Sequence, residues 1–341
     1  MTTSATGTSG TAPSVVRALT AAARHAAHPD AGNPPGDSSS APPGLCRACG
    51  RDETVLADRP DATVVRHESA VAKAHAPATD PAGHRARVAV AAHPSLAGIL
   101  LPPLPAPTPH VAGRPVTAWP YGAPVDPDRP DDAPWEEAAT LLARLHAVRP
   151  AALAPLAVPP TRGPLKAAQA LSRMRAAGRH PAGADVERAW AGLPAWARGE
   201  APAPEGGSLC HGDVHLGQLV RHPVPDGPWL LIDVDDLGLG DAAWDLARPA
   251  AWYAAGLLAP DEWQRFLGAY RSAGGPAVPP GGDPWPRLDI PARVLTVQTA
   301  ALAVAKSAEQ GRDLDEVEET MIESCARIAT LITELGAGPS S

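Results

Sequence analysis

The sequence predicts an α+β chain of two lobes: a small amino-terminal lobe rich in β-strands and a larger, mainly α-helical carboxy-terminal lobe. The chain has 341 residues with 44% hydrophobic content, enough to bury one large core. Short apolar runs of strand type occur before residue 119, and long stretches with helical spacing follow residue 134. The proline-containing segment Trp119–Pro124 separates the two patterns and predicts a hinge.

Composition sets the expected boundaries. The amino-terminal segment is rich in Ser, Thr, Gly, Ala and Pro, so we expect it to be disordered apart from a short helix around Val15–Ala27. The expected divisions are a disordered segment (1–43), a small lobe (44–118), a hinge (119–126), a large lobe (127–335) and a tail (336–341).

Two neighbouring strands are expected in the small lobe. They are Ala62–His67 and Ala70–His75, with Glu68 and Ser69 as the turn between them. The second strand carries Lys73 in the series Val-Ala-Lys, although this chain uses Arg at nearly every basic position. A compact ammonium group and an arginine fork are not interchangeable, which favours a specific role for this lysine. An ordinary surface lysine is the alternative. A helix is expected from about Pro81 to His93.

The first helix of the large lobe is expected over Pro134–Val148. A proline lies in its first turn, acidic residues come early, leucines follow helical spacing, and Pro150 stops it. The same spacing predicts further helices at Lys166–Ala177, Asp185–Arg198, Asp261–Ser272, Pro291–Gln310 and Asp313–Leu335.

Two carboxylate motifs about twenty residues apart carry most of the chemical information. The first places Asp213 on a loop and the amide of Gln218 five residues later; the second ends an apolar run with Asp233. One carboxylate can accept the proton of a hydroxyl, while the amide and the second carboxylate can hold Mg²⁺ on the phosphates of a nucleotide. This pattern suits phosphoryl transfer.

These motifs resemble the aminoglycoside phosphotransferase and choline kinase-like family, relatives of the protein kinases. That family has His-Gly-Asp-x-His-x-x-Asn, then Ile-Asp, then Gly-Asp-x-x-x-Asp-Leu-Ala. The matching residues are His211, Gly212, Asp213, His215, Ile232, Asp233, Gly240, Asp241, Asp245, Leu246 and Ala247. The resemblance implies a protein kinase-like fold and an enzyme that moves the γ-phosphate of ATP to a hydroxyl of a small molecule, with ATP and Mg²⁺ as cofactors.

The resemblance also implies roles for single residues. Asp213 would be the catalytic base, Asp233 the main Mg²⁺ ligand, and His215 a contact to the transferred phosphate. Lys73 would pair with the α and β phosphates, and Gln218 stands where the family has a metal-binding Asn. For Asp241 and Asp245 we favour structural roles, as a helix cap or as acceptors of catalytic-loop N–H groups. His211 is expected to be a packed scaffold histidine.

The chain departs from the pattern at three places. Gln218 keeps the carbonyl ligand but adds a methylene, as in maltokinase-like members of the family. Between Asp52 and Lys73 no Gly-rich loop occurs, so Ala57–Asp61 would have to cover the phosphates. The helix after Lys73 lacks the Glu that holds this lysine in protein kinases; Asp80 or Glu68 could replace it. A catalytically inactive kinase-like module that binds nucleotide or a protein partner therefore stays open as the alternative.

The acceptor is less defined. Carboxylates and ring faces after the metal segment could bind a cation, with ordinary packing or solvated surface as the alternative for each: Asp235, Asp236, Trp244, Trp252, Tyr253 and Glu262. Aminoglycoside, aminoalcohol, sugar and amino-acid hydroxyls all remain open at this point.

Charge and cysteine content limit the partners and the compartment. A net charge of −8 argues against general nucleic-acid binding. No leader and no apolar run of eighteen residues is present, so a cytoplasmic protein without a membrane segment is expected.

Four cysteines do not make a disulfide framework in a chain of this length. Cys46 and Cys49 have the spacing of a zinc knuckle or redox pair, but two reduced thiols in a turn are favoured. A zinc site would need His67 or His75 to be brought back to them.

Overall fold

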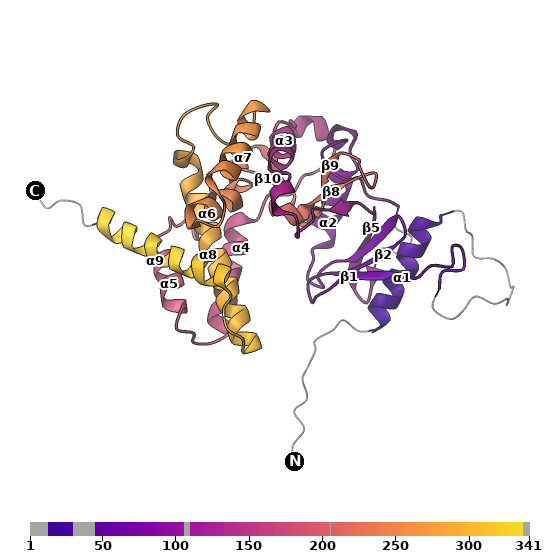
Figure 1. Ribbon diagram of the computed structural model, residues 1–341, viewed down its shortest axis with the longest axis horizontal. Coiled ribbons are helices and arrows are strands. Elements are labelled where there is room, and N and C mark those ends of the chain that lie inside the picture. The colour runs from indigo at the N-terminus through magenta and orange to yellow at the C-terminus, as the bar shows by residue number, and fades with distance from the viewer. Residues whose placement is uncertain (1–12, 30–44, 106–109, 205, 337–341) are drawn as a thin grey trace, which may run out of the picture. The chain divides into compact units, whose positions relative to one another are not determined.

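The structure is a computed structural model that describes residues 13–29, 45–105, 110–204 and 206–336 (Figure 1). The chain divides into two compact units. The first contains the described residues up to Pro124 together with Val220–Ile232, and the second contains Val125–Leu219 and the described residues from Asp233 onward. The α+β class is confirmed, with an antiparallel sheet first and a mostly helical part after it.

A five-stranded sheet forms the centre of the first unit, in the order β1-β2-β3-β5-β4. Its antiparallel strands are β1 (Thr54–Asp58), β2 (Thr63–His67), β3 (Ala70–Ala74), β4 (His110–Val111) and β5 (Arg114–Pro120). The two expected strands around the turn at Glu68 are thus confirmed. Lys73 is paired with Val64 on one side and with Thr117 on the other.

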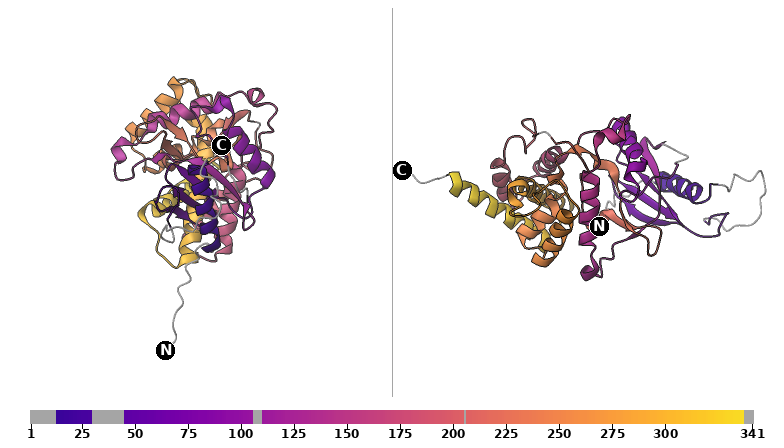
Figure 2. Two further views of the ribbon diagram at one scale, coloured as in Figure 1. Left: turned by 90° about the vertical axis from the view of Figure 1, so that its right-hand side faces the viewer. Right: turned by 90° about the horizontal axis from the view of Figure 1, so that it is seen from above.

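Helix α1 (Pro13–Ala27) agrees with the short helix expected around Val15–Ala27. The apolar side chains of Val15, Leu19 and Ala23 are buried against strand residues of the sheet, including Val65 and Ala72. Figures 1 and 2 show α1, in indigo, lying against the sheet. A short helix is marginal by itself, and packing of its apolar face supplies most of its stability. The rest of the amino-terminal segment, residues 1–12 and 30–43, lies outside the described residues.

The remaining elements of the first unit are α2 and a small sheet. Helix α2 (Pro81–Ala91) is close to the expected one, and the Asp80 carboxylate caps it by accepting the N–H groups of Ala82 and Gly83. The sheet is formed by β6 (Ala123–Pro124), β8 (Leu219–Arg221) and β9 (Trp229–Leu231).

Seven helices and a strand pair make up the described part of the second unit. The helices are α3 (Trp135–His146), α4 (Gly163–Ala176), α5 (Gly183–Ala191), α6 (Ala247–Ala255), α7 (Pro260–Ser272), α8 (Trp285–Gln310) and α9 (Glu316–Gly336); the strands are β7 (Ser208–Cys210) and β10 (Gly238–Gly240). Helix α5 is shorter than expected because Gly192 and Pro194 follow its end. Helix α8 starts six residues before Pro291, which lies inside it. Helix α6 was not expected.

The main core of the second unit lies among α4, α5, α8 and α9. Among the described residues, α8 is long and apolar enough to cross a bilayer, but 61% of its apolar window is buried inside the protein. That degree of burial is typical of the central helix of a core. This helix also lines the pocket described below through Leu295 and Gln298.

Candidate active site

The first motif forms a loop between β7 and a short 3-10 helix, η4 (Leu216–Gln218). Gly212 has a φ of +84°, and a Cβ atom at this position would lie 2.4 Å from the carbonyl oxygen of Asp236. Both facts require glycine here, because other residues rarely adopt this backbone conformation and none would fit the space. The main chain on both sides of Asp213 is therefore fixed by local packing.

A buried carboxylate holds the same loop from behind. Asp245, whose side chain is 0% exposed, accepts the N–H of His211 at 2.6 Å and the N–H of Gly212 at 2.8 Å. These are the loop contacts that the sequence suggested for Asp245. Asp241 caps the short 3-10 helix η6 (Ala242–Trp244) and pairs with Arg287 at 3.1 Å, also in agreement with a structural role. His211 is fully buried, as a scaffold residue should be.

Asp245 belongs to a chain of buried hydrogen bonds. Nε2 of His146 lies 2.9 Å from its carboxylate, and Nδ1 of His146 lies 2.7 Å from the hydroxyl of Tyr270. The Tyr270 oxygen accepts the N–H of Ala277, so its O–H donates to His146, and Nε2 of His146 donates to Asp245. Burial alone would raise the pKa of Asp245, but His146 and the loop N–H groups lower it below its ordinary value. The carboxylate is thus ionised and fully bonded.

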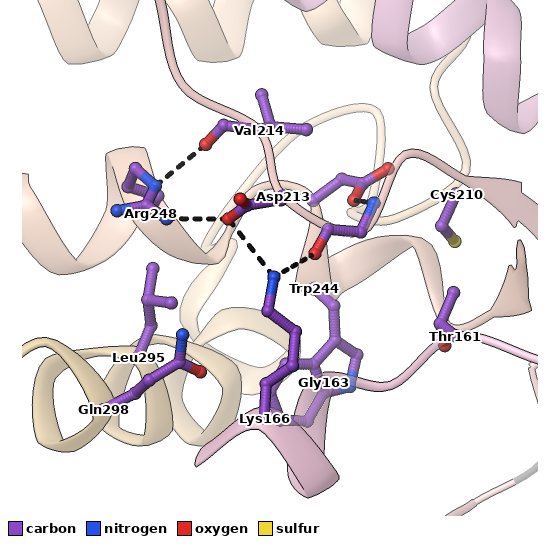
Figure 3. A pocket seen from close by; sticks show the side chains of 12 residues that line it. Thr161, Gly163, Lys166, Cys210, Asp213, Val214, Trp244, Arg248, Leu295 and Gln298 are labelled. Carbon is purple, nitrogen blue, oxygen red and sulfur yellow. Dashed lines mark hydrogen bonds and ion pairs between the residues drawn. The ribbon is translucent and has the colours of Figure 1, made fainter. Parts of the chain in front are cut away.

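Two cations hold the carboxylate of Asp213 (Figure 3). Nη2 of Arg248 lies 3.0 Å and Nζ of Lys166 lies 3.4 Å from its Oδ1. Arg248 also donates to the carbonyl of Val214 at 3.0 Å, which fixes the loop at the next residue. Burial raises the pKa of Asp213, but Lys166 and Arg248 outweigh it and the net pKa is lowered. Asp213 is therefore a carboxylate at neutral pH, able to accept a hydrogen bond from a hydroxyl.

Lys166 links Asp213 to a second acid. Its Nζ lies 2.7 Å from Oδ2 of Asp236, and Arg162 binds the other carboxylate oxygen of Asp236. Both basic residues lie at the start of α4, which precedes the Asp213 loop in the sequence. The pocket around Asp213 is lined by the basic residues Lys166 and Arg248 and by the carboxylate of Asp245, together with Trp244, Leu295 and Gln298.

His215 and Gln218 lie together at η4. Nδ1 of His215 accepts the N–H of Gly217, and its Nε2 lies 3.2 Å from the amide nitrogen, Nε2, of Gln218. Burial and the charge of Arg248 lower the pKa of His215, so the ring is neutral at pH 7. A neutral imidazole with an accepting Nδ1 carries its proton on Nε2, so two nitrogen donors would face each other here. We therefore assign the amide of Gln218 with its nitrogen and oxygen exchanged, which places the oxygen opposite Nε2. That oxygen has a second lone pair, which can still bind a metal ion.

Asp233 begins the second motif in an unusual conformation. Its φ and ψ are 62° and 78°, in the left-handed region, which costs a residue other than glycine roughly 1–3 kcal/mol. Such positions concentrate at functional sites. The charges of Asp213 and Asp233 both act on the pKa of His215, so both carboxylates lie on the side of the loop where His215 and Gln218 meet. A carboxylate and an amide oxygen are the hard ligands that Mg²⁺ prefers, so Asp233 and Gln218 fit this ion.

Lys73 lies on β3 of the first unit, whereas these four residues belong to the second. The two acids suggested as its partners are both engaged elsewhere: Asp80 caps α2, and Glu68 pairs with Arg51 at 3.0 Å. The turn at Arg59–Ala62 joins β1 to β2 without a glycine, as the sequence indicated. Helix α2 presents His84 to the region after β3, where its ring lies 4.1 Å from that of His75.

Sequence reasoning missed the basic groups that surround Asp213, namely Lys166 and Arg248, and the His146–Tyr270 support of Asp245. A signal existed for Lys166, because it is one of three lysines in a chain that otherwise uses arginine. Nothing in the local sequence indicated Arg248, which reaches the loop from α6.

Most of the side chains suggested for cation binding have other partners. Asp236 is paired with Arg162 and Lys166, and Glu262 accepts the indole N–H of Trp135 and caps α7. Trp252 lies under Arg248, Tyr253 stacks on Trp263, and Trp244 packs against Gly163. For these five, packing and pairing account for the side chain, so the cation-site interpretation gains no support.

Comparison with solved structures finds similar folds. A choline/ethanolamine kinase family protein from Mesorhizobium loti is similar with a TM-score of 0.52 and 16% identity, over 83% of this chain and 88% of that one. Spectinomycin phosphotransferase APH(9)-Ia, solved with ADP and spectinomycin, is similar with a TM-score of 0.54 and 12% identity, over 83% of this chain and 94% of that one. A thermostable mutant of aminoglycoside phosphotransferase APH(4)-Ia, solved with AMP-PNP and hygromycin B, is similar with a TM-score of 0.52 and 15% identity, over 84% of this chain and 95% of that one.

At these identities the structural matches show the fold alone. A search of the curated proteins gives no match to this sequence. The sequence profile of the phosphotransferase enzyme family, however, matches residues 54–287, which is more than half of the chain and includes both motifs. The chain therefore belongs to the phosphotransferase enzyme family.

Proposed function

We propose that this protein transfers the γ-phosphate of ATP to a hydroxyl of a small, uncharged or anionic acceptor. The observation that carries the proposal is the carboxylate of Asp213, ionised and fixed on a loop whose backbone is held by Asp245 and Gly212. In phosphoryl transfer, positioning and charge neutralisation supply most of the rate. A rigid carboxylate that orients the acceptor hydroxyl and accepts its proton suits that demand.

Asp233 and Gln218 would hold Mg²⁺, and Lys73 would pair with the α and β phosphates. Mg²⁺, when bound, neutralises charge on the phosphates. His215 is neutral, so it supplies no positive charge beside the base. Lys166, at 3.4 Å from Asp213, supplies that charge instead, and we propose that it stabilises the phosphoryl group during transfer.

The same basic groups support a choice among acceptors. Lys166 and Arg248 flank Asp213, and Arg162 lies behind them on Asp236. Two like charges about 4 Å apart repel by roughly 1–4 kcal/mol between bulk water and a protein surface. Because Lys166 and Arg248 are already paired with carboxylates, an ammonium group of an aminoglycoside or aminoalcohol would have to compete with them for Asp213, while a sugar or another neutral polyol would not. We therefore propose a sugar-like acceptor in preference to an aminoglycoside, and a cytoplasmic location, where ATP is supplied.

The test is ADP release from MgATP in the presence of three acceptor sets: neutral mono- and disaccharides, aminoglycosides, and aminoalcohols. Stimulation by a neutral saccharide is expected, and Asp213→Ala should lower that turnover roughly 10²–10⁴-fold, the usual contribution of a placed acid or base. Asp261→Ala, which removes an exposed carboxylate in the first turn of α7, is the control and should keep full activity. Stimulation by aminoglycosides alone would refute the acceptor class. Equal turnover by Asp213→Ala would refute the role of the base.

A further inference from the structure

Four side chains with metal-binding atoms meet in the first unit, and none of them belongs to the candidate active site. His28 follows the end of α1, Cys46 and Cys49 lie in the turn before β1, and His67 is the last residue of β2. One ligand atom from each of the four lies within 4.8 Å of all the others. Three stretches of chain thus converge on one point with two thiols and two imidazoles.

The distances suit a tetrahedral ion. With Zn–S of about 2.3 Å and Zn–N of about 2.0–2.1 Å, the edges of a Cys₂His₂ tetrahedron measure roughly 3.3–3.8 Å. Sγ of Cys49 lies 3.3 Å from Nε2 of His67, and the rings of His28 and His67 meet edge to face with centroids 5.5 Å apart. Shifts of about 1 Å or less bring the longer separations to these values.

The turn that carries the cysteines is built to present both sulfur atoms together. Gly50 has a φ of +69° and donates its N–H to the carbonyl of Cys46 at 2.7 Å, and Cys46 donates its own N–H to Arg51. Two intervening residues between the cysteines and a glycine directly after the second are the spacing of a zinc knuckle. Neither cysteine is in a disulfide.

Buried nitrogen atoms at this point lack partners. Nε2 of His28 and Nδ1 of His67 are both buried, and neither has a hydrogen bond within the described part of the chain. His67 is 0% exposed and Cys46 is 5% exposed. An unsatisfied buried polar atom costs roughly 1–3 kcal/mol. A metal ion bound to Nε2 of His28 would remove this cost there, while His67 would bind the ion through Nε2, the nitrogen that faces Cys49. A redox pair of cysteines would need no histidines here.

We propose that His28, Cys46, Cys49 and His67 form a structural zinc site. Two thiolates and two neutral imidazoles balance the charge of Zn²⁺ and leave no open coordination position, which distinguishes a structural from a catalytic site. The ion would join the end of α1 to the sheet that carries Lys73, beside the ion pair of Arg24 with Glu53 at 2.6 Å. Its role is to stabilise the first unit, so the inference holds whatever the acceptor is.

The first test is metal analysis of the full chain, purified under reducing conditions without a histidine tag. One zinc per chain is expected. Apoprotein made with a chelator should bind Co²⁺ and give the intense visible bands of a tetrahedral site and a near-ultraviolet thiolate charge-transfer band. Protein that lacks zinc and fails to bind added Zn²⁺ or Co²⁺ would overturn the proposal, as would a Cys46–Cys49 disulfide in freshly purified protein.

Single substitutions test which residues bind the ion. Cys49→Ser and His67→Ala should each lose stoichiometric zinc, whereas Cys325→Ala, which removes a buried cysteine on α9, should keep it. A chelator should lower the melting temperature of the native protein and of Cys325→Ala but leave that of Cys49→Ser unchanged. Zinc that persists at one per chain in the Cys49→Ser and His67→Ala variants would place it elsewhere and overturn the assignment. The chelator experiment on the native protein does not depend on whether a variant folds.

Discussion

Replacing Asp245 tests whether one buried carboxylate holds the catalytic loop. It accepts three hydrogen bonds, from the N–H groups of His211 and Gly212 and from Nε2 of His146, at 2.6, 2.8 and 2.9 Å. Asp245→Ala leaves these three buried donors without an acceptor. At roughly 1–3 kcal/mol for each, and with some relief from water entering the space, the unfolding free energy of the second unit should fall by about 3–6 kcal/mol. Asp245→Asn keeps one acceptor oxygen and should cost about half as much.

The assay is urea unfolding followed by tryptophan fluorescence. Seven of the nine tryptophans lie in the second unit, so the signal reports mainly on it. With a slope of about 3 kcal/mol per molar urea, the midpoint for Asp245→Ala should move down by roughly 1–2 M. The control is Asp241→Ala, which removes a half-exposed cap and its pair with Arg287 and should cost about 1 kcal/mol or less. Equal midpoints for the two variants would refute the role given to Asp245.

The pH dependence of the unfolding free energy provides a second test of Asp245. Because the folded state lowers the pKa of Asp245, the stabilisation is fully present above the unfolded pKa of about 3.9 and is lost as the pH falls through the lower folded value. The native protein should therefore lose this contribution only below about pH 4. The unfolding free energy of Asp245→Asn should lack this part of the dependence on acid pH. If the variant loses stability with falling pH in the same way as the native protein, Asp245 is not ionised in the folded state.

Two other predictions concern the residues around Asp213. Lys166→Met removes a cation 3.4 Å from Asp213, so the pKa of Asp213 should rise, the acid limb of the rate profile should move to higher pH, and turnover should fall about tenfold or more. The matched control is Lys306→Met on the exposed side of α8; an unmoved acid limb in Lys166→Met would count against the contact. Gln218→Asn shortens the amide that lies 3.2 Å from His215, and the Mg²⁺ concentration for half-maximal activity should rise roughly 10-fold. A Mg²⁺ titration of activity checks this, and an unchanged midpoint would show that the extra methylene does not set the metal geometry.

Local patterns predicted the parts of the fold that depend on neighbouring residues. The strand pair around Glu68, the helix after Asp80 and the proline-started α3 follow from short-range spacing and capping, and the structure confirms them. The contacts of Asp241 and Asp245 were predictable because both motifs fix their spacing to the loop.

Features that depend on long-range packing were not predictable. A short helix around Val15–Ala27 was expected, but its packing against strand residues such as Val65 and Ala72, more than 40 positions later, was not. Arg248 reaches Asp213 across 35 positions, and Lys166 reaches it across 47. Likewise, His28 could not be linked to Cys46 and Cys49 from the sequence, because α1 and the turn before β1 meet only in the fold.

The most direct test of the proposed function is calorimetric titration of ATP, with and without Mg²⁺, into the native protein and Asp233→Asn. Asparagine tolerates the left-handed conformation of Asp233, so the variant removes the charge with little change in the backbone. We predict that the native protein binds MgATP more tightly than ATP alone and that Asp233→Asn loses this difference. Binding that is the same with and without Mg²⁺ in the native protein, or no binding at all, would contradict the nucleotide site and favour the inactive kinase-like module.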